Sequence, residues 1–384
     1  MKIGIDCRTI LNPLSGEGAG VGHYTHYLVK NLLKVDHKND YVLFFDSAMK
    51  DTSQYRRENS SPRYFPFSQY RRFLPFAYSH ILISGAINRE NLDLYHAPAN
   101  VIPLGYSGPS VVTIHDLAIY QNPSWFPSQV FSTRLLVPKT LRRARSIIAV
   151  SESTAEDLRE LFNVPEDKLE IIYEGVDTAI RENEEAVDVK KKFNLPDRYL
   201  CFVGTLEPRK NLIRLIQAYA DLKAKDDRLA NIPIILAGKR GWQSEDIFKT
   251  ITELKLEKSV RNAGYVTKNE KLELMKQAAA FVFPSSYEGF GLPVLEAMAL
   301  GTPVLTSNLS SLPEIVGNAA YQVNPEDTYA IVEGLQQILF NDKLRTKLKE
   351  RGPIQAKKFT WEKVALRTVA LYEKVGQRSN GYSI

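Results

Sequence analysis

The sequence predicts an α/β protein with two doubly wound parallel sheets, and three observations support this fold class. Apolar runs with strand character alternate with amphipathic helical patterns along the chain, as is typical of parallel strands covered by helices. The same alternation begins again near residue 198. With 384 residues, the chain is also long enough for two domains of ordinary size.

The first domain is expected over residues 1–180. Its first strand, Lys2–Cys7, is followed by a glycine-rich loop and a helical pattern at Tyr24–Leu33. Ser151 or Ser153 is expected to cap the helix that begins in SESTAEDL. Further strands are predicted at Tyr41–Phe45, Leu94–His96, Ser110–Ile114, Ser146–Val150 and Leu169–Tyr173.

A polar, charged linker region is expected at 181–198, and the second domain at 199–358. The pattern at 359–375 predicts a final amphipathic helix, and a polar tail follows it to residue 384. In the second half, strands are predicted at 198–206, 232–237, 260–265 and 281–283, and helices at 211–224, 245–255 and 269–278.

The composition sets few limits on function. Lysine and arginine exceed aspartate and glutamate by six charges, an excess that favours anionic substrates or an anionic membrane surface but does not imply nucleic acid. Cys7 and Cys201 lie in apolar runs, so we expect buried free thiols and a cytoplasmic protein. Neither a signal peptide nor an apolar run of about 18 residues is recognisable, so any membrane contact is expected to be peripheral.

The most informative segment is FVFPSSYEGFGLPVLEAMALGTPV, residues 281–304. Its strand run leads into a glycine-rich turn, and Pro293 is expected at the first position of a helix. The N–H groups near Gly291 and Leu292, together with the helix dipole, would bind an anion such as phosphate.

Two acidic residues flank this turn, Glu288 before it and Glu296 about one helical turn after it. Carboxylates cannot pair with phosphate, but they accept hydrogen bonds from hydroxyl groups. Hydroxyl groups beside a phosphate site indicate a nucleotide-sugar as the ligand.

This segment resembles the E-x7-E signature of retaining glycosyltransferases with the GT-B fold, in particular glycosyltransferase family 4, and the likeness extends through EGFGLPVLEAMA and GTPV. It implies two Rossmann-like domains facing across a cleft, with the C-terminal helix crossing back to the acceptor-binding first domain. By the same resemblance, Glu288 contacts the donor sugar, Glu296 binds the ribose, and Phe290, Gly291 and Leu292 hold the diphosphate.

A second motif, GTLEPRKNL at 204–212, leads from the strand that opens the second domain into a helix, and its Gly204 is expected among the donor-binding residues. Arg209 could grip phosphate oxygens with its planar fork, and Lys210 would add a point charge, so the pair could stabilise a diphosphate leaving group. The chain has no Asp-x-Asp pair for a divalent cation. The sequence therefore predicts transfer without a metal.

The loop GEGAGVGHYTHYL, residues 16–28, places Gly16, Gly18, Gly20 and Gly22 between a strand and a helix. It is not a clean dinucleotide-binding motif, and simple flexibility would also explain its glycines. The family resemblance implies that Gly20 and Gly22 flank the donor diphosphate.

Two further segments gain roles from the resemblance. In TIHDLAIY, His115 matches a histidine that contacts the donor sugar, while Asp116 would orient it or cap the next turn. In AGYV, Tyr265 and Val266 are expected to bind the nucleotide base through backbone groups. In YEGVD, Glu174 replaces the asparagine that is more usual in the family, which leaves its role open.

Basic and aromatic residues gather in 55–83, which contains Arg56, Arg57, Arg63, Arg71 and Arg72, and a second basic run holds Lys139, Arg142, Arg143 and Arg145. Such segments can contact an anionic membrane or a lipid-linked acceptor, or can form ordinary helix surfaces. Binding to nucleic acid is the least favoured interpretation.

These signals predict a retaining hexosyltransferase of cell-surface polysaccharide synthesis that acts on a glycan or lipid-linked acceptor. GDP-mannose is the first expected donor and a UDP-hexose the second. An NAD-dependent oxidoreductase would explain the N-terminal glycine loop and Asp46, but not the basic pair or the Glu288 turn. A nucleotide-sugar-binding protein without activity is the other alternative.

Overall fold

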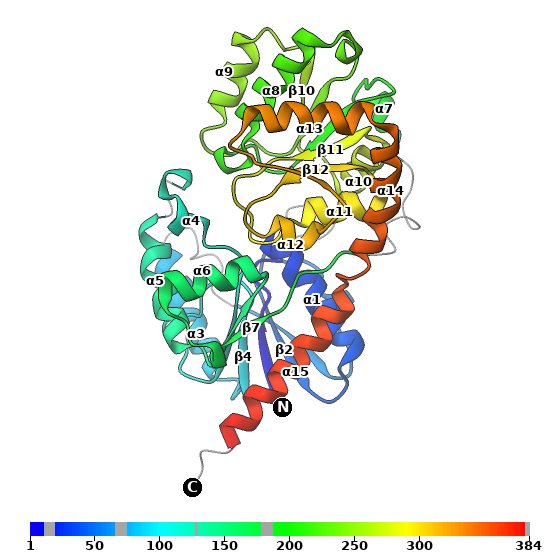
Figure 1. Ribbon diagram of the computed structural model, residues 1–384. Coiled ribbons are helices and arrows are strands. Elements are labelled where there is room, and N and C mark those ends of the chain that lie inside the picture. Colours follow the sequence, from blue (N-terminus) through cyan, green and yellow to red (C-terminus); the bar gives the residue numbers. More distant parts are fainter. Residues whose placement is uncertain (11–19, 66–74, 127–129, 178–186, 381–384) are drawn as a thin grey trace. The chain divides into compact units, whose positions relative to one another are not determined.

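The computed structural model describes residues 1–10, 20–65, 75–126, 130–177 and 187–380 (Figure 1). The chain forms two compact units. The first comprises Met1–Tyr120, Ser128–Gly175 and Trp361–Ile384, and the second comprises Gln121–Pro127 and Val176–Thr360. Residues 181–186 of the expected linker lie outside the described residues, and Val189–Lys192 forms the short helix α7 of the second unit.

The first unit contains a seven-stranded, entirely parallel sheet with the strand order β3-β2-β1-β4-β5-β6-β7. The central strands are buried on both faces, which explains their nearly continuous apolar sequences. The strands are β1 (Lys2–Asp6), β2 (Asp40–Phe45), β3 (Ser60–Tyr64), β4 (Leu94–Ala97), β5 (Ser110–Ile114), β6 (Ser146–Ala149) and β7 (Leu169–Ile171).

Helices cover this sheet and are joined to it by loops at the strand ends (Figure 1). Ser151 caps α6 by accepting a hydrogen bond from the Thr154 N–H at 3.0 Å, which confirms one of the two expected caps. The helices are α1 (Val21–Val35), α2 (Pro75–Ala77), α3 (Ile83–Asn88), α4 (Ala118–Gln121), α5 (Val130–Arg143), α6 (Glu152–Phe162) and α15 (Trp361–Asn380), with single turns η1 (Ser53–Tyr55), η3 (Tyr78–Leu82) and η5 (Glu166–Lys168).

The C-terminal helix α15 packs against α1 of the first unit (Figure 1). At its start the Trp361 ring stacks on Tyr27, with centroids 5.4 Å apart. Farther along, the Tyr372 hydroxyl lies 2.6 Å from Nδ1 of the buried His96, whose Nε2 contacts Thr113 Oγ1 at 2.8 Å. Buried polar atoms need such partners, so this network holds α15 against the strands β4 and β5 of the sheet.

The second unit repeats the architecture with a six-stranded parallel sheet of order β10-β9-β8-β11-β12-β13. This is the 3-2-1-4-5-6 order of a doubly wound sheet, so the predicted fold class is confirmed. The strands are β8 (Leu200–Val203), β9 (Ile234–Ala237), β10 (Val260–Gly264), β11 (Ala280–Phe283), β12 (Val304–Ser307) and β13 (Tyr321–Val323).

The helices of the second unit lie on both faces of its sheet (Figure 1). They are α7, α8 (Leu212–Lys225), α9 (Glu245–Glu253), α10 (Lys268–Gln277), α11 (Leu292–Leu300), α12 (Leu312–Val316), α13 (Thr328–Phe340) and α14 (Asp342–Ala356), with turns η4 (Pro123–Trp125), η7 (Pro208–Lys210) and η8 (Asp227–Leu229). In the segment that contains η4, the Trp125 ring lies 6.5 Å from that of Tyr287.

Two glycines let neighbouring strand ends approach closely at the carboxyl edge of the second sheet. Gly238, just after β9, has φ +145°, and a Cβ there would lie 2.0 Å from the carbonyl oxygen of Gly204, just after β8. Any side chain at Gly238 would therefore force apart the loops after β8 and β9.

Cys7 and Cys201 are both buried and free, as the sequence predicts. Among the described residues, no helix is both long and apolar enough to cross a membrane.

Candidate functional site

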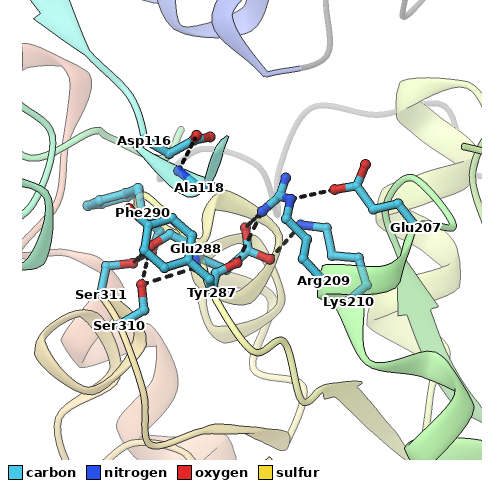
Figure 2. A network of polar contacts seen from close by, with 10 residues as sticks. All are labelled: Asp116, Ala118, Glu207, Arg209, Lys210, Tyr287, Glu288, Phe290, Ser310 and Ser311. Carbon is cyan, nitrogen blue, oxygen red and sulfur yellow. Dashed lines mark hydrogen bonds and ion pairs between the residues drawn. The ribbon is translucent and has the colours of Figure 1, made fainter. Parts of the chain in front are cut away.

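Three charged side chains meet at the carboxyl edge of the second sheet, where the neighbouring strands β8 and β11 end (Figure 2). Arg209 Nη1 donates to Glu288 Oε2 at 2.9 Å, and Lys210 Nζ donates to Glu288 Oε1 at 2.5 Å. The strand order turns at β8 and β11, and doubly wound sheets bind ligands at such a point. The two sequence motifs therefore form one cluster.

The loops that carry these groups are held by further hydrogen bonds. Arg209 Nη1 also donates to the Tyr287 carbonyl oxygen at 3.1 Å, and the Ser286 N–H donates to the Arg209 carbonyl oxygen at 2.9 Å. Ser311 Oγ donates to the carbonyl oxygens of Glu288 and Phe290, both at 3.0 Å (Figure 2). These bonds fix the backbone on both sides of the Glu288 side chain.

Glu207, which the sequence analysis did not single out, completes the cluster. Its Oε1 lies 2.5 Å from Arg209 Nε, and its side chain is buried. The cluster thus contains two cations and two carboxylates. It offers a ligand hydrogen-bond donors fixed in place rather than a net positive charge.

The charges of the cluster control its ionisation. Burial alone would raise the pKa of the Glu288 carboxyl, but Arg209 and Lys210 outweigh burial and lower that pKa to about 2. Burial lowers the pKa of the Lys210 ammonium and Arg209 lowers it further, while Glu288 acts in the opposite direction. Glu288 is therefore a carboxylate at neutral pH.

The glycine-rich turn leads directly into α11. Gly291 caps the helix with φ +106°, and a Cβ there would lie 2.7 Å from Leu312 Cδ2, so only glycine fits this position. The helix begins at Leu292, so Pro293 is its second residue and not its first, as the sequence predicted. Phe290 is buried against the Phe359 ring, 5.9 Å away.

Glu296 is buried in the otherwise apolar helix α11. Its two carboxylate oxygens accept from Lys271 Nζ on α10, at 2.6 and 2.8 Å. A buried carboxylate needs such a partner. Lys271 matches no motif in the sequence and was therefore not predicted.

The remaining predicted donor-binding residues of the second unit lie at neighbouring strand ends. Gly204 follows β8, and Tyr265 and Val266 follow β10. The Tyr265 ring is 44% exposed, with Lys239 Nζ 5.1 Å from its centroid, whereas Val266 is buried. The exposed ring is a surface on which a planar base could stack.

Of the predicted glycine loop in the first unit, residues 16–19 lie outside the described residues. Gly20 caps α1 with φ +68°. A Cβ on Gly22 would lie 2.5 Å from the Thr9 carbonyl oxygen, so close packing already accounts for this glycine. Their predicted role at the donor diphosphate stays a prediction.

His115 follows β5, as expected, but it is 9% exposed and both of its ring nitrogens have partners. Nδ1 lies 2.9 Å from Glu174 Oε1, and Nε2 lies 2.8 Å from the Pro98 carbonyl oxygen. The structure thus gives Glu174 a clear role as the partner of His115. Contact of His115 with a sugar would require one of these bonds to change and stays a prediction.

Asp116 takes the second of its two expected roles. Its Oδ1 accepts a hydrogen bond from the Ala118 N–H at 3.2 Å and so caps the turn that begins α4 (Figure 2). Within the described residues, no group of three or more histidine, cysteine, aspartate or glutamate side chains is arranged to hold a metal ion.

Comparison with protein families identifies the class of protein. The model described as "Glycosyl transferases group 1" matches residues 183–355, which include the whole Arg209, Lys210 and Glu288 cluster. The model "Glycosyltransferase Family 4" matches residues 18–180. The chain therefore belongs to the group 1, family 4 glycosyltransferases, and it is a glycosyltransferase enzyme with the GT-B fold.

Individual relatives agree with this assignment. The chain is 32% identical to "O-antigen chain mannosyltransferase B" of Escherichia coli, with 97% of this chain and 100% of that protein covered. It is 28% identical to the "Serotype-specific mannosyltransferase WbdA" of Escherichia coli, over 94% of this chain and 46% of that longer protein. The chain thus spans about half the length of that second relative.

Solved structures show the same fold at low identity. Sucrose-phosphate synthase from Thermosynechococcus elongatus aligns with a TM-score of 0.76 and 20% identity, over 97% of this chain and 98% of that one. WaaG, a glycosyltransferase involved in lipopolysaccharide biosynthesis, aligns with a TM-score of 0.72 and 14% identity, over 96% and 99% of the two chains. The NAD-dependent oxidoreductase alternative is set aside by the family assignment.

The pairing of His115 with Glu174 makes a prediction about pH. Burial lowers the pKa of His115, but the hydrogen bond and charge of Glu174 outweigh it, so the pKa lies above the ordinary 6.5. The stability that the charged ring contributes is therefore complete below about pH 6.5 and is lost as the pH rises through the raised pKa. In Glu174→Gln, burial dominates and the pKa of His115 is expected to fall below 6.5.

An NMR titration of the imidazole groups measures this shift. His96 is an internal control, because burial lowers its pKa to about 3 and it should stay neutral between about pH 5 and 8. A pKa of His115 at or below its ordinary value in the unsubstituted chain would contradict the assigned pairing.

Proposed function

We propose that the chain is a retaining mannosyltransferase that uses GDP-mannose and extends a cell-surface polysaccharide. The observation that carries the proposal is the ion-paired cluster of Glu288, Arg209 and Lys210 within the group 1 family match. The mannosyltransferases of O-antigen synthesis among the relatives support mannose as the sugar. A UDP-hexose is the alternative donor, because the exposed Tyr265 ring could stack on either base.

In this proposal the cluster binds the diphosphate end of the donor. Arg209 and Lys210 lie in the turn η7 that follows β8, and their ion pairs with Glu288 join this turn to the loop that leads into α11. Because their donors are already fixed by Glu288 and Glu207, little reorganisation is needed when negative charge develops on the leaving diphosphate. Glu288 would accept a hydrogen bond from a donor-sugar hydroxyl, and Glu296 from the ribose.

The configuration of the anomeric carbon is retained if the acceptor attacks this carbon from the same face from which the diphosphate departs. The bond between the anomeric carbon and the phosphate oxygen breaks, a bond from the acceptor oxygen to that carbon forms, and the acceptor proton passes to the leaving diphosphate. Glu288 is a poor nucleophile here, because it is held in two ion pairs. Its depressed pKa also makes it a poor general base.

The activity test is a nucleotide-release assay over GDP- and UDP-sugars. Lys210→Ala and Glu288→Ala are each expected to lower kcat/KM by roughly 10- to 100-fold, because one charged hydrogen bond is worth about 1.5–3 kcal/mol. GDP-mannose should be the best donor. Activity is expected to persist in EDTA, because the basic pair would take the place of a metal.

Lys249→Ala is the matched control, because this lysine lies on α9 with its side chain 71% exposed. The control should release nucleotide at the rate of the unsubstituted chain. Full activity of Lys210→Ala would show that the cluster takes no part in the reaction. Loss of activity in EDTA that manganese restores would refute the metal-independent mechanism. Nucleotide release only from UDP-sugars would show that the donor is a UDP-sugar and not GDP-mannose.

We further propose that the enzyme is cytoplasmic and that its first unit contacts the membrane surface. Three large apolar side chains of segment 75–88 are exposed, Phe76 by 52%, Ile81 by 61% and Leu82 by 36%. On α5, Leu135 is 45% exposed and stands among the exposed basic residues Arg134, Lys139 and Arg142. Apolar side chains flanked by cations suit an anionic lipid surface.

Other parts of the predicted basic segment form ordinary structure or lie elsewhere. Arg63 on the edge strand β3 pairs with Glu90 at 2.8 Å, and 66–74, which includes Arg71 and Arg72, lies outside the described residues. The membrane proposal therefore rests on 75–88 and α5.

Flotation with vesicles tests the membrane proposal. The chain is expected to float with vesicles that contain anionic lipid, and Ile81→Ser should weaken this binding because it removes an exposed apolar side chain. Ile354→Ser, at a position 65% exposed in the second unit, is the control and should bind unchanged. Equal binding to neutral vesicles, or equal loss in both variants, would rule out this surface.

A further inference from the structure

The ion pair between Lys271 and Glu296 joins the helices α10 and α11 of the second unit. Nζ of Lys271 donates to both carboxylate oxygens of Glu296, at 2.6 and 2.8 Å. The Glu296 side chain is 7% exposed, whereas that of Lys271 is 21% exposed. The carboxylate is thus buried, but the lysine beside it keeps part of its side chain at the surface.

The stability of the fold does not explain why this pair is charged. Apart from Glu296, the residues of α11 are all apolar. The cost of taking an ion pair out of water is often as large as its attraction, so apolar side chains of similar size stabilise a protein equally well or better. An apolar pair would therefore suit the packing of α10 against α11. The charges point to a ligand rather than to packing.

The helix that carries Lys271 is held at both ends. At its start, the Thr267 N–H donates to Glu270 Oε2 at 2.8 Å, and the Glu270 N–H donates to Thr267 Oγ1 at 3.4 Å, which together form a capping box. At its end, Thr302 Oγ1 donates to the Met275 carbonyl oxygen at 2.8 Å. These bonds fix the position of Lys271 before a ligand arrives.

Glu296 shares a face of α11 with Leu292, the first residue of the helix, because residues four apart lie on one face. Side chains of an α-helix also tilt toward its N-terminus. The proposed function places the donor diphosphate at that N-terminus. The ribose is joined to the diphosphate, so we expect the ribose beside the pair of Lys271 and Glu296.

The pair offers hydrogen-bond acceptors and a donor at one point. A carboxylate has about four acceptor positions. Lys271 uses one on each oxygen of Glu296, which leaves one on each oxygen. An ammonium has three N–H donors, and within the part of the chain that the structure describes, Lys271 Nζ donates to Glu296 alone. One donor therefore remains. Because a hydroxyl group both donates and accepts, two neighbouring hydroxyl groups on one ring match this set.

We propose that Lys271 makes the nucleotide site specific for ribose over 2′-deoxyribose. It holds both oxygens of Glu296 in place for the 2′- and 3′-hydroxyl groups, and its remaining N–H donates to one of these hydroxyl groups. The inference rests on the proposed function and deepens it, because it adds a specificity-determining residue to the ribose role of Glu296.

Isothermal titration calorimetry on the full chain tests the proposal with GDP, UDP and their 2′-deoxy forms as probes. The unsubstituted chain should bind a ribonucleotide roughly tenfold or more tightly than its 2′-deoxy form, because a site that bonds a hydroxyl group rejects the analogue without it. Lys271→Met should lower this ratio by roughly threefold or more, since it removes the donors that orient Glu296. Lys271→Arg keeps charged donors and should retain a higher ratio than Lys271→Met.

Lys276→Met is the matched control, because Lys276 lies on the same helix, is 49% exposed and pairs with Glu273. It should keep the ratio of the unsubstituted chain, and circular dichroism checks that each variant is folded. A lysine that only supports the fold would weaken both forms by the same factor. An unchanged ratio in Lys271→Met would therefore overturn the inference.

The comparison of the two forms in the unsubstituted chain needs no variant, so the inference stays testable even if Lys271→Met does not fold. Equal binding of GDP and 2′-deoxy-GDP, and of UDP and 2′-deoxy-UDP, would overturn this inference alone. Failure of the chain to bind either GDP or UDP would refute the proposed function together with it. The two failures are thus distinguishable.

Discussion

The ion pairs of Glu288 with Arg209 and Lys210 are the interaction on which the site depends. The Lys210 and Glu288 side chains are buried and that of Arg209 is 16% exposed, and a buried charge without a partner costs several kcal/mol. Each charge is therefore tolerated only while the others stay in place. The pairing ties the loop after β8 to the loop after β11, and it fixes hydrogen-bond donors before any ligand arrives.

The strand order explains why these loops meet. Arg209 and Glu288 are far apart in sequence, but β8 and β11 are neighbours in the sheet, so their carboxyl ends lie side by side. The first unit repeats this plan with β1 and β4. The carboxyl edge of the second sheet presents cations balanced by carboxylates, which suits a diphosphate.

The sequence predicts the features that depend on local patterns. Buried parallel strands such as β5 and β11 are apolar runs, and each ends within one residue of its predicted end. The edge strand β3, Ser60–Tyr64, was missed because it is partly exposed and contains a proline. Between 305 and 358 no element was predicted, although β13, α13 and α14 lie there.

The site could be predicted only in part, for a related reason. Motifs identified Glu288, Glu296 and the basic pair, because a glycine-rich turn or a strand-to-helix turn is visible locally. The partners of these groups were not visible. Lys271, which pairs with Glu296, and Glu174, which pairs with His115, are matched through tertiary contacts that no spacing in the sequence encodes.

The most direct measurement of the central ion pair compares the pH dependence of the free energy of unfolding in the unsubstituted chain and in Glu288→Gln. The pKa of Glu288 falls from 4.5 to about 2 on folding, so its contribution is present above pH 4.5 and is lost as the pH falls toward 2. The unsubstituted chain should lose roughly 3 kcal/mol more than the variant over that range. Parallel profiles for the two proteins would contradict the account.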